Sequence, residues 1–262
     1  MPSRLRAALR LTAYLAWTVA LIPVQIVLLR LSPRAAVQFP RWYHRSCCRI
    51  IGLGVRVIGR PSEARPTLFV ANHVSYLDIT ALGAVVAGSF VAKTEVRNWP
   101  LYGLLARLQR TVFVERRAAR AARHRDEIAE RLADGDRLVL FAEGTSGDGI
   151  RVLPFRSAFF DAAAGGVAVQ PVSIAYTRLD GMALGRRLRP FVAYYGDMTL
   201  APHLIGLVGL GAITAEIVFH PVVTIEQVGS RKALARLCED RVAAGVSAAL
   251  AGRASQLVEA SP

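Results

Sequence analysis

The chain has 262 residues, enough for one sizeable hydrophobic core with a short appendage. Its hydrophobic content is 53%, and its 33 lysines and arginines against 19 acidic residues give a formal net charge of +14. This combination favours membrane lipids or acidic small molecules as partners and no nucleic acid, because basic nucleic-acid binders are usually polar and no zinc-finger, homeodomain or RNP-like pattern is present.

The first feature along the chain is an apolar segment near the amino terminus. Leu11–Leu29 carries no charge and is long enough to cross a bilayer, although Pro23 allows a kink. The next segment, Pro33–Ile51, mixes aromatic residues with arginines, as an interfacial helix does. Residues 1–51 are therefore expected to form a helical membrane anchor. Arginines flank the apolar segment on both sides, so a membrane-spanning helix and a helix that dips into one leaflet both remain open.

The cysteines indicate the compartment. Cys47, Cys48 and Cys238 form no Cys-x-x-Cys spacing and no even framework. We expect three buried thiols in a protein that faces a reducing, cytosolic environment.

From residue 52 the pattern changes to short β-branched runs that alternate with helical stretches. This alternation predicts an α/β domain, a single sheet flanked by helices, over residues 52–250, followed by a frayed tail at 251–262. The expected strands are Val55–Ile58, Thr67–Val70, Phe90–Ala92, Thr111–Val114, Arg137–Phe141, Ala168–Ile174, Phe191–Tyr195 and Glu216–Phe219. The expected helices are Leu77–Val86, Leu101–Leu108, Arg117–Ala133, Ser157–Ala164 and Arg231–Leu250.

A histidine and an aspartate follow the expected strand Thr67–Val70, five residues apart. An imidazole can take the proton of an attacking hydroxyl, and a carboxylate on the other ring nitrogen fixes its tautomer and stabilises the imidazolium. The spacing suits this pairing if His73 lies in the loop and Asp78 in the first turn of the next helix. The alternative is that Asp78 only completes a helix capping box with Ser75.

Further polar motifs lie at the ends of later strands, where an α/β fold gathers its site. Lys93 and Arg116 are candidates for holding an anionic headgroup or a donor phosphate, with ordinary surface charge as the alternative. Glu143, before Gly144 and Thr145, is a candidate for binding or aligning the acceptor, with capping of a turn as the alternative.

Other chemistries fail on spacing. The segment Gly144–Gly147 misses the G-x-S-x-G elbow of serine hydrolases by one residue. The chain has no H-E-x-x-H motif, no third glycine of a dinucleotide fingerprint and no P-loop lysine. We therefore expect no metal and no cofactor. No activated serine or cysteine is visible either, so we expect direct transfer without a covalent enzyme intermediate.

Four motifs follow one another between about Leu68 and Pro171: the N-H-x4-D box with His73 and Asp78, the F-V-E-R segment Phe113–Arg116, the E-G-T segment Glu143–Thr145, and Pro171. In this order they resemble the motifs of the lysophosphatidate acyltransferase family of glycerolipid synthesis. The resemblance implies a glycerolipid acyltransferase-like fold behind a two-helix membrane element. It also implies acyl transfer to a lysolipid hydroxyl from a thioester of acyl carrier protein or coenzyme A. His73 is then the catalytic base and Asp78 its partner. The residues it assigns to substrate binding are Lys93, Phe113, Arg116, Glu143, Gly144, Thr145, Ser146 and Pro171.

Departures from the family pattern concern the acceptor. Ser146 stands where the third motif usually has an arginine, Ala142 replaces a proline, and Arg110 replaces a glycine of the second motif. The sequence of residues 141–149 is similar to that of the bacterial branch of the family that acylates lyso-ornithine lipid, a zwitterion without phosphate. We expect that acceptor, at a bacterial inner membrane with the catalytic domain facing the cytoplasm. Three alternatives stay open: acylation of both acceptors, a dedicated 1-acyl-sn-glycerol-3-phosphate acyltransferase, and a non-catalytic scaffold that binds anionic lipid.

Overall fold

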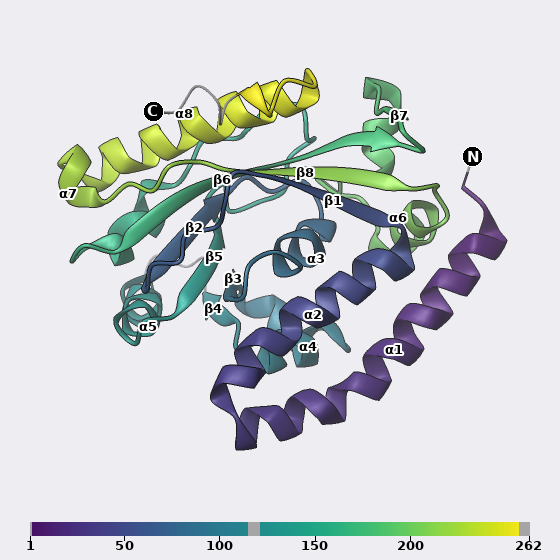
Figure 1. Cartoon of the computed structure of the whole chain (residues 1–262), viewed down its shortest axis with the longest axis horizontal. Coiled ribbons are helices and arrows are strands. Elements are labelled where there is room, and N and C mark those ends of the chain that lie inside the picture. Colours follow the sequence, from purple (N-terminus) through teal and green to yellow (C-terminus); the bar gives the residue numbers. More distant parts are fainter. Residues whose placement is uncertain (1, 115–120, 257–262) are drawn as a thin grey trace.

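A mixed sheet forms the centre of the computed structural model, which describes residues 2–114 and 121–256. The described strands follow the order β1-β8-β6-β2-β5-β3-β4, and β7 pairs with β6 at the side (Figure 1). Strands β2 to β6 run parallel, whereas β8 lies antiparallel to β6 and parallel to β1. The strands are β1 (Leu53–Ile58), β2 (Thr67–Ala71), β3 (Ser89–Lys93), β4 (Val112–Val114), β5 (Arg137–Phe141), β6 (Ala168–Leu179), β7 (Met182–Ala183) and β8 (Ile213–Phe219).

Helices cover both faces of this sheet, which is why its central strands are apolar on both sides. In β2, Phe69 and Ala71 join the core beneath α2 and α3, whereas Leu68 and Val70 join the core beneath α5 and α8. Figure 1 shows α8 on one side of the sheet and α2 and α3 on the other. The helices are α1 (Arg4–Leu31), α2 (Pro33–Ile51), α3 (Leu77–Gly83), α4 (Tyr102–Leu108), α5 (Ala121–Ala133), α6 (Leu200–Val208), α7 (Ile225–Val228) and α8 (Arg231–Leu250), with 3₁₀ turns η1 (Thr94–Asn98), η3 (Ser157–Ala163) and η4 (Arg186–Phe191).

The predicted fold class is confirmed, and the differences are local. The strand predicted at Phe191–Tyr195 is wrong: the backbone N–H of Val192 bonds the carbonyl of Arg189 within a turn, and that of Tyr194 bonds Val74. A short buried apolar run cannot be assigned from its pattern alone, and this one packs under the loop of His73. The segments Thr94–Asn98 and Ser157–Ala163 form 3₁₀ turns, and α6 was not predicted.

The carboxyl-terminal residues that the structure describes do not form a free tail. Ala254 is buried beside β1 and α8, and Ser255 accepts a hydrogen bond of 3.1 Å from Arg56. The frayed tail expected at 251–262 is therefore wrong for residues 251–256, and residues 257–262 lie outside the described part of the chain.

The two amino-terminal helices form a hairpin that packs along the α/β domain. By length and composition α1 is the one described helix apolar enough to cross a membrane. Both of its halves are nevertheless tied to the domain: the Arg10 guanidinium bonds the carbonyls of Val208 and Leu210 at 3.0 and 2.8 Å, and the Gln25 amide bonds that of Leu108 at 2.9 Å. The helix therefore lies beside the domain rather than projecting from it.

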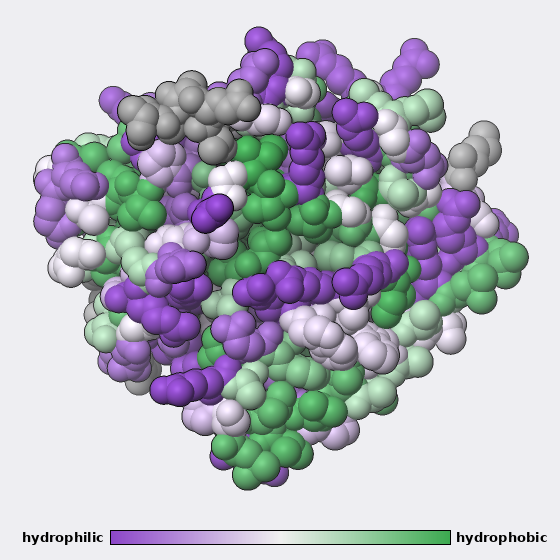
Figure 2. Space-filling model, in the orientation of Figure 1, coloured by the Kyte–Doolittle hydropathy of each residue, from purple (hydrophilic) through white to green (hydrophobic). Residues whose placement is uncertain are grey.

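The outer face of this hairpin is apolar. Hydrophobic surface covers the turn between α1 and α2, next to a row of hydrophilic side chains over α2 (Figure 2). The sequence of α2 includes four arginines, Arg34, Arg41, Arg45 and Arg49. The exposed large hydrophobic residues of α1 are Leu5, Leu9, Leu15, Val19, Val24, Val27 and Leu31. An apolar helix beside an arginine-rich one is suited to a membrane interface.

Candidate active site

The site lies where the parallel strands end. His73 follows β2, Glu143 follows β5, and Lys93 ends β3. Because β2, β5 and β3 run in the same direction side by side, their carboxyl ends share one edge of the sheet. The topology thus gathers residues that are up to 70 positions apart in the chain.

His73 and Asp78 form a hydrogen-bonded pair at this edge. The distance between His73 Nδ1 and Asp78 Oδ2 is 2.8 Å. The predicted placement is confirmed, because His73 lies in the loop after β2 and Asp78 in the first turn of α3. Since Nδ1 is taken by the carboxylate, Nε2 is the ring nitrogen left for a substrate, and it bonds no other described residue.

The Asp78 carboxylate is completely buried and fully engaged. Oδ2 also accepts the backbone N–H groups of Val74 and Ser75 at 2.6 and 3.0 Å, and Oδ1 accepts the Tyr176 hydroxyl at 2.7 Å. The bond from Ser75 is half of the capping box that was the alternative reading of this aspartate. Capping and pairing with His73 are therefore carried by the same oxygen and do not exclude each other.

The His73 ring is held from one side and open on the other. It stacks on Phe141, the last residue of β5, with ring centroids 4.1 Å apart and planes 18° apart. The side chain is 22% exposed, whereas its partner Asp78 is 0% exposed. A fixed ring with one accessible nitrogen is the geometry that a general base needs.

Glu143 is a buried carboxyl beside this pair, and its side chain Oε2 has no hydrogen-bond partner among the described residues. Burial, with the added charge of Asp78 and Asp148, raises the pKa of Glu143 to about 8. The group therefore keeps its proton at neutral pH and can donate a hydrogen bond. The loop that follows folds back on the histidine, because the Gly147 N–H bonds the His73 carbonyl at 2.8 Å.

The remaining predicted binding residues are scattered over the carboxyl edge and the sheet. Lys93 is exposed at the end of β3, and the guanidinium of Arg97 lies over the Phe113 ring at 5.9 Å. Thr145 is exposed and Ser146 half-buried in the loop after β5. Arg116 lies outside the described residues.

Pro171 stands apart from the site. It pairs in register with Val70 inside the sheet, on the face opposite to Phe141. Its carbonyl accepts the His220 N–H at 3.0 Å.

Tyr176 and His203 contact residues of the site, although they belong to none of the motifs. Tyr176 lies beyond the end predicted for its strand, which runs on to Leu179. Burial, followed by the charge of Asp78, raises the pKa of its hydroxyl well above its usual range, so the hydroxyl donates to the carboxylate. His203 Nδ1 lies 3.0 Å from the Tyr76 hydroxyl, in the loop between His73 and Asp78. If this strand had been predicted at its full length, Tyr176 would have been a candidate for the site. No pattern in the sequence indicates His203.

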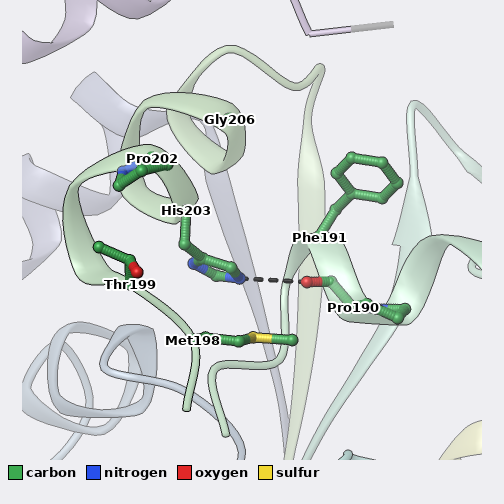
Figure 3. A pocket seen from close by; sticks show the side chains of 7 residues that line it. All are labelled: Pro190, Phe191, Met198, Thr199, Pro202, His203 and Gly206. Atoms are coloured by element: carbon green, nitrogen blue, oxygen red, sulfur yellow. Dashed lines mark hydrogen bonds between the residues drawn. The ribbon is translucent and has the colours of Figure 1, made fainter.

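An apolar pocket of about 420 Å³ lies beside His203. Figure 3 shows the His203 ring pointing to the Pro190 carbonyl, 3.1 Å away, between α6 and the end of η4. The pocket is lined by Pro190, Phe191, Met198, Thr199, Pro202, His203 and Gly206, and neither His73 nor Asp78 is among these residues. Its connection to the site runs through the bond between His203 and Tyr76. Such a lining is suited to an alkyl chain.

Comparisons with known proteins agree with this geometry. A family model described as "Acyltransferase" matches residues 54–175. The lyso-ornithine lipid O-acyltransferase of Brucella abortus is 47% identical over 97% of this chain and 98% of its own length, and that of Rhizobium meliloti is 42% identical over 94% and 87%. A 1-acyl-sn-glycerol-3-phosphate acyltransferase of Neisseria gonorrhoeae is 32% identical over 72% of this chain and 74% of its own.

A solved structure shares the fold. The 1-acyl-sn-glycerophosphate acyltransferase PlsC of Thermotoga maritima superimposes with a TM-score of 0.69 at 24% identity, over 93% of each chain. The sheet, its amino-terminal helices and the relatives define an acyltransferase that acts on lysolipids. Within that class, the chain belongs to the acyltransferase family of the lyso-ornithine lipid and 1-acyl-sn-glycerol-3-phosphate enzymes. Membership removes the alternative of a non-catalytic scaffold.

Proposed function

We propose that this enzyme transfers a fatty acyl group from a thioester of acyl carrier protein or coenzyme A to the hydroxyl of lyso-ornithine lipid. The observation that carries the proposal is the pairing of an accessible His73 with a buried Asp78 in a chain 47% identical, over nearly its whole length, to an enzyme of that name. The reaction takes place at the cytoplasmic face of a bacterial inner membrane, and the enzyme requires no metal or other cofactor.

The chemistry follows from the two ring nitrogens. His73 Nε2 takes the hydroxyl proton while the oxygen attacks the thioester carbonyl, and Asp78 at Nδ1 stabilises the imidazolium that forms. Collapse of the tetrahedral intermediate breaks the carbon–sulfur bond, and the imidazolium returns the proton to the departing thiolate. Transfer is direct: the three cysteines are buried, and Ser75 beside the histidine is fully buried as well.

Glu143 acts in its protonated form. A neutral carboxyl beside His73 does not repel the acceptor oxygen as that oxygen gains negative charge, and it can donate a hydrogen bond to it. The raised pKa and the Oε2 atom without a partner support this role. We assign binding of the substrates to Lys93, Phe113 and the loop residues Gly144, Thr145 and Ser146 around the pair. Arg116, which the family motif implies as a further binding residue, lies outside the described residues.

A guanidinium belongs to this surface even though Ser146 replaces the usual arginine. Arg156 Nε lies 2.9 Å from the place that a Cβ on Gly144 would take, so its side chain lies against the loop after Glu143. The replacement at Ser146 therefore does not leave the loop without a nearby guanidinium. Together with the relatives named for 1-acyl-sn-glycerol-3-phosphate, Arg156 supports that lipid as a second acceptor.

Membrane attachment places the site near its acceptor. We propose that α1 lies in the cytoplasmic leaflet, with its exposed apolar side chains in the acyl region and the α2 arginines at the headgroups. The contacts of α1 with α4 and with the residues after α6 support a helix that does not cross the bilayer.

The test of the function uses the full-length enzyme in lipid vesicles, with acyl-carrier-protein thioester as donor. Lyso-ornithine lipid and lysophosphatidate are supplied in parallel, and kcat/KM is measured for each. We expect the larger value for lyso-ornithine lipid. A parent enzyme that acylates lysophosphatidate and not lyso-ornithine lipid would contradict the proposal.

A further inference from the structure

The loop from Glu143 to Gly149 is fixed against the catalytic histidine at several points. The Gly147 N–H bonds the His73 carbonyl at 2.8 Å, and a Cβ on Gly147 would lie 3.7 Å from Glu143 Oε2. Gly149, at φ +71°, packs so closely that a Cβ there would lie 2.8 Å from Val74 Cγ1. The Arg189 guanidinium bonds the Gly149 carbonyl at 2.9 Å. Asp148, between the two glycines, is thus held beside the site.

The Asp148 side chain is half-buried and is held in place by the turn that follows it. Its Oδ1 accepts the backbone N–H groups of Ile150 and Arg151 at 2.9 and 3.5 Å. Among the described residues no lysine or arginine forms an ion pair with it, although its charge reaches Glu143 and Arg189. A carboxylate beside a phosphate-binding site would weaken that site, because like charges repel. A cationic group of the acceptor would be a suitable partner for this carboxylate.

A cation lies beside the start of this loop, although Arg156 comes after the loop in the chain. The Arg156 N–H bonds the Ala142 carbonyl at 3.0 Å, and its guanidinium carbon lies 3.1 Å from the place of a Cβ on Gly144. The side chain is exposed and makes no hydrogen bond or ion pair with another described residue. One carboxylate, Asp148, is thus close enough to Glu143 for its charge to act there, and one guanidinium, that of Arg156, lies against Gly144.

We propose that Asp148 and Arg156 together select the acceptor headgroup: Asp148 binds an ammonium and Arg156 a carboxylate of one zwitterionic amino-acid lipid. This rests on the proposed function, and it assigns recognition of the headgroup to two residues outside the motif positions. A lyso-ornithine lipid offers both charges. A lysophosphatidate offers only the anion, which Arg156 binds and Asp148 repels.

The decisive variant is Asp148→Asn, because asparagine keeps the side chain oxygen that accepts the Ile150 N–H and removes only the charge. We expect kcat/KM for lyso-ornithine lipid to fall about 10- to 100-fold, the size of one lost charge-assisted hydrogen bond, and that for lysophosphatidate to rise. Arg156→Gln should lower both values. Asp240→Asn and Arg236→Gln, two exposed positions on α8, are the matched controls and should change neither.

The readout that separates the possible outcomes is the ratio of kcat/KM for lyso-ornithine lipid to kcat/KM for lysophosphatidate. If the asparagine variant is poorly folded, Asp148→Ser repeats the test, because serine also keeps an oxygen that can cap the turn. A ratio that shifts toward lysophosphatidate in the Asp148 variants and not in the controls supports the proposed roles of Asp148 and Arg156. An unchanged ratio, in a parent enzyme that does use lyso-ornithine lipid, overturns the role of Asp148 and leaves the proposed function standing. A parent enzyme that does not use that lipid overturns both.

Discussion

The His73–Asp78 pair and the loop from Glu143 to Gly149 differ in how firmly their charged side chains are held. The two oxygens of Asp78 receive four hydrogen bonds, and the carboxylate has no exposed surface. Asp148, in the loop that folds back on the same histidine, bonds only backbone N–H groups of its own turn, and the Arg156 side chain bonds no described residue. Proton transfer needs fixed geometry, whereas the choice of a headgroup rests on a few charges that can be exchanged without disturbing the core. With the proposed roles of Asp148 and Arg156, this difference lets one fold serve acceptors of unlike charge.

The largest effect is expected from Asp78→Asn, at the rigid end of this comparison. The amide still fills the space, but its NH₂ group and oxygen cannot satisfy His73, the two backbone N–H groups and Tyr176 together, and the wrong histidine tautomer becomes accessible. We expect turnover to fall by about 10²–10⁴-fold. Steady-state kinetics and thermal unfolding of the same preparation check this result. If activity stayed near the parent level while stability fell, Asp78 would be only a cap.

A smaller loss is expected from Tyr176→Phe. The variant keeps the ring in the core and removes the hydroxyl that bonds Asp78 Oδ1 at 2.7 Å. A hydrogen bond to a charged group contributes about 1.5–3 kcal/mol, so the sum of lost stability and lost transition-state stabilisation should be of that order. Denaturant unfolding measures the lost stability, and kcat/KM of the same variant measures the lost transition-state stabilisation. Tyr43→Phe, which removes a hydroxyl that bonds Thr18 away from the site, is the control, and an equal loss of kcat/KM there would contradict the assignment.

The smallest effect on activity, with a distinct pH signature, is expected from Glu143→Gln. Because the folded protein raises the pKa of Glu143 to about 8 from the ordinary 4.5, the folded state holds a proton that the unfolded state releases. This carboxyl therefore lowers the stability progressively as pH rises from 4.5 to 8, and above 8 the penalty is constant. Glutamine should gain up to roughly 5 kcal/mol relative to the parent across that window. Urea unfolding at both ends of the window measures the gain, and parallel pH profiles of parent and variant would refute the raised pKa.

The placement of the His73–Asp78 pair was largely predictable from the sequence. The arrangement of the loop after Glu143 was not. The motif from Asn72 to Asp78 follows a strongly apolar strand, so its loop-and-helix placement could be inferred from spacing alone. Tyr176 escaped because the strand continues beyond its most apolar stretch. Arg156 and Asp148 escaped because their meaning depends on how the loop folds back on His73. Local patterns do not encode such contacts, and Phe191–Tyr195 was misassigned for the same reason.

The measurement that tests the central claim most directly is the turnover of His73→Ala with acyl-carrier-protein thioester and lyso-ornithine lipid. His73 stacks on Phe141 and is partly exposed, so the variant is expected to fold, which its thermal unfolding verifies. We predict a fall in turnover of at least about 10²-fold, the contribution of one general base, with little change in KM. Near-parent turnover in a well-folded variant would contradict the account.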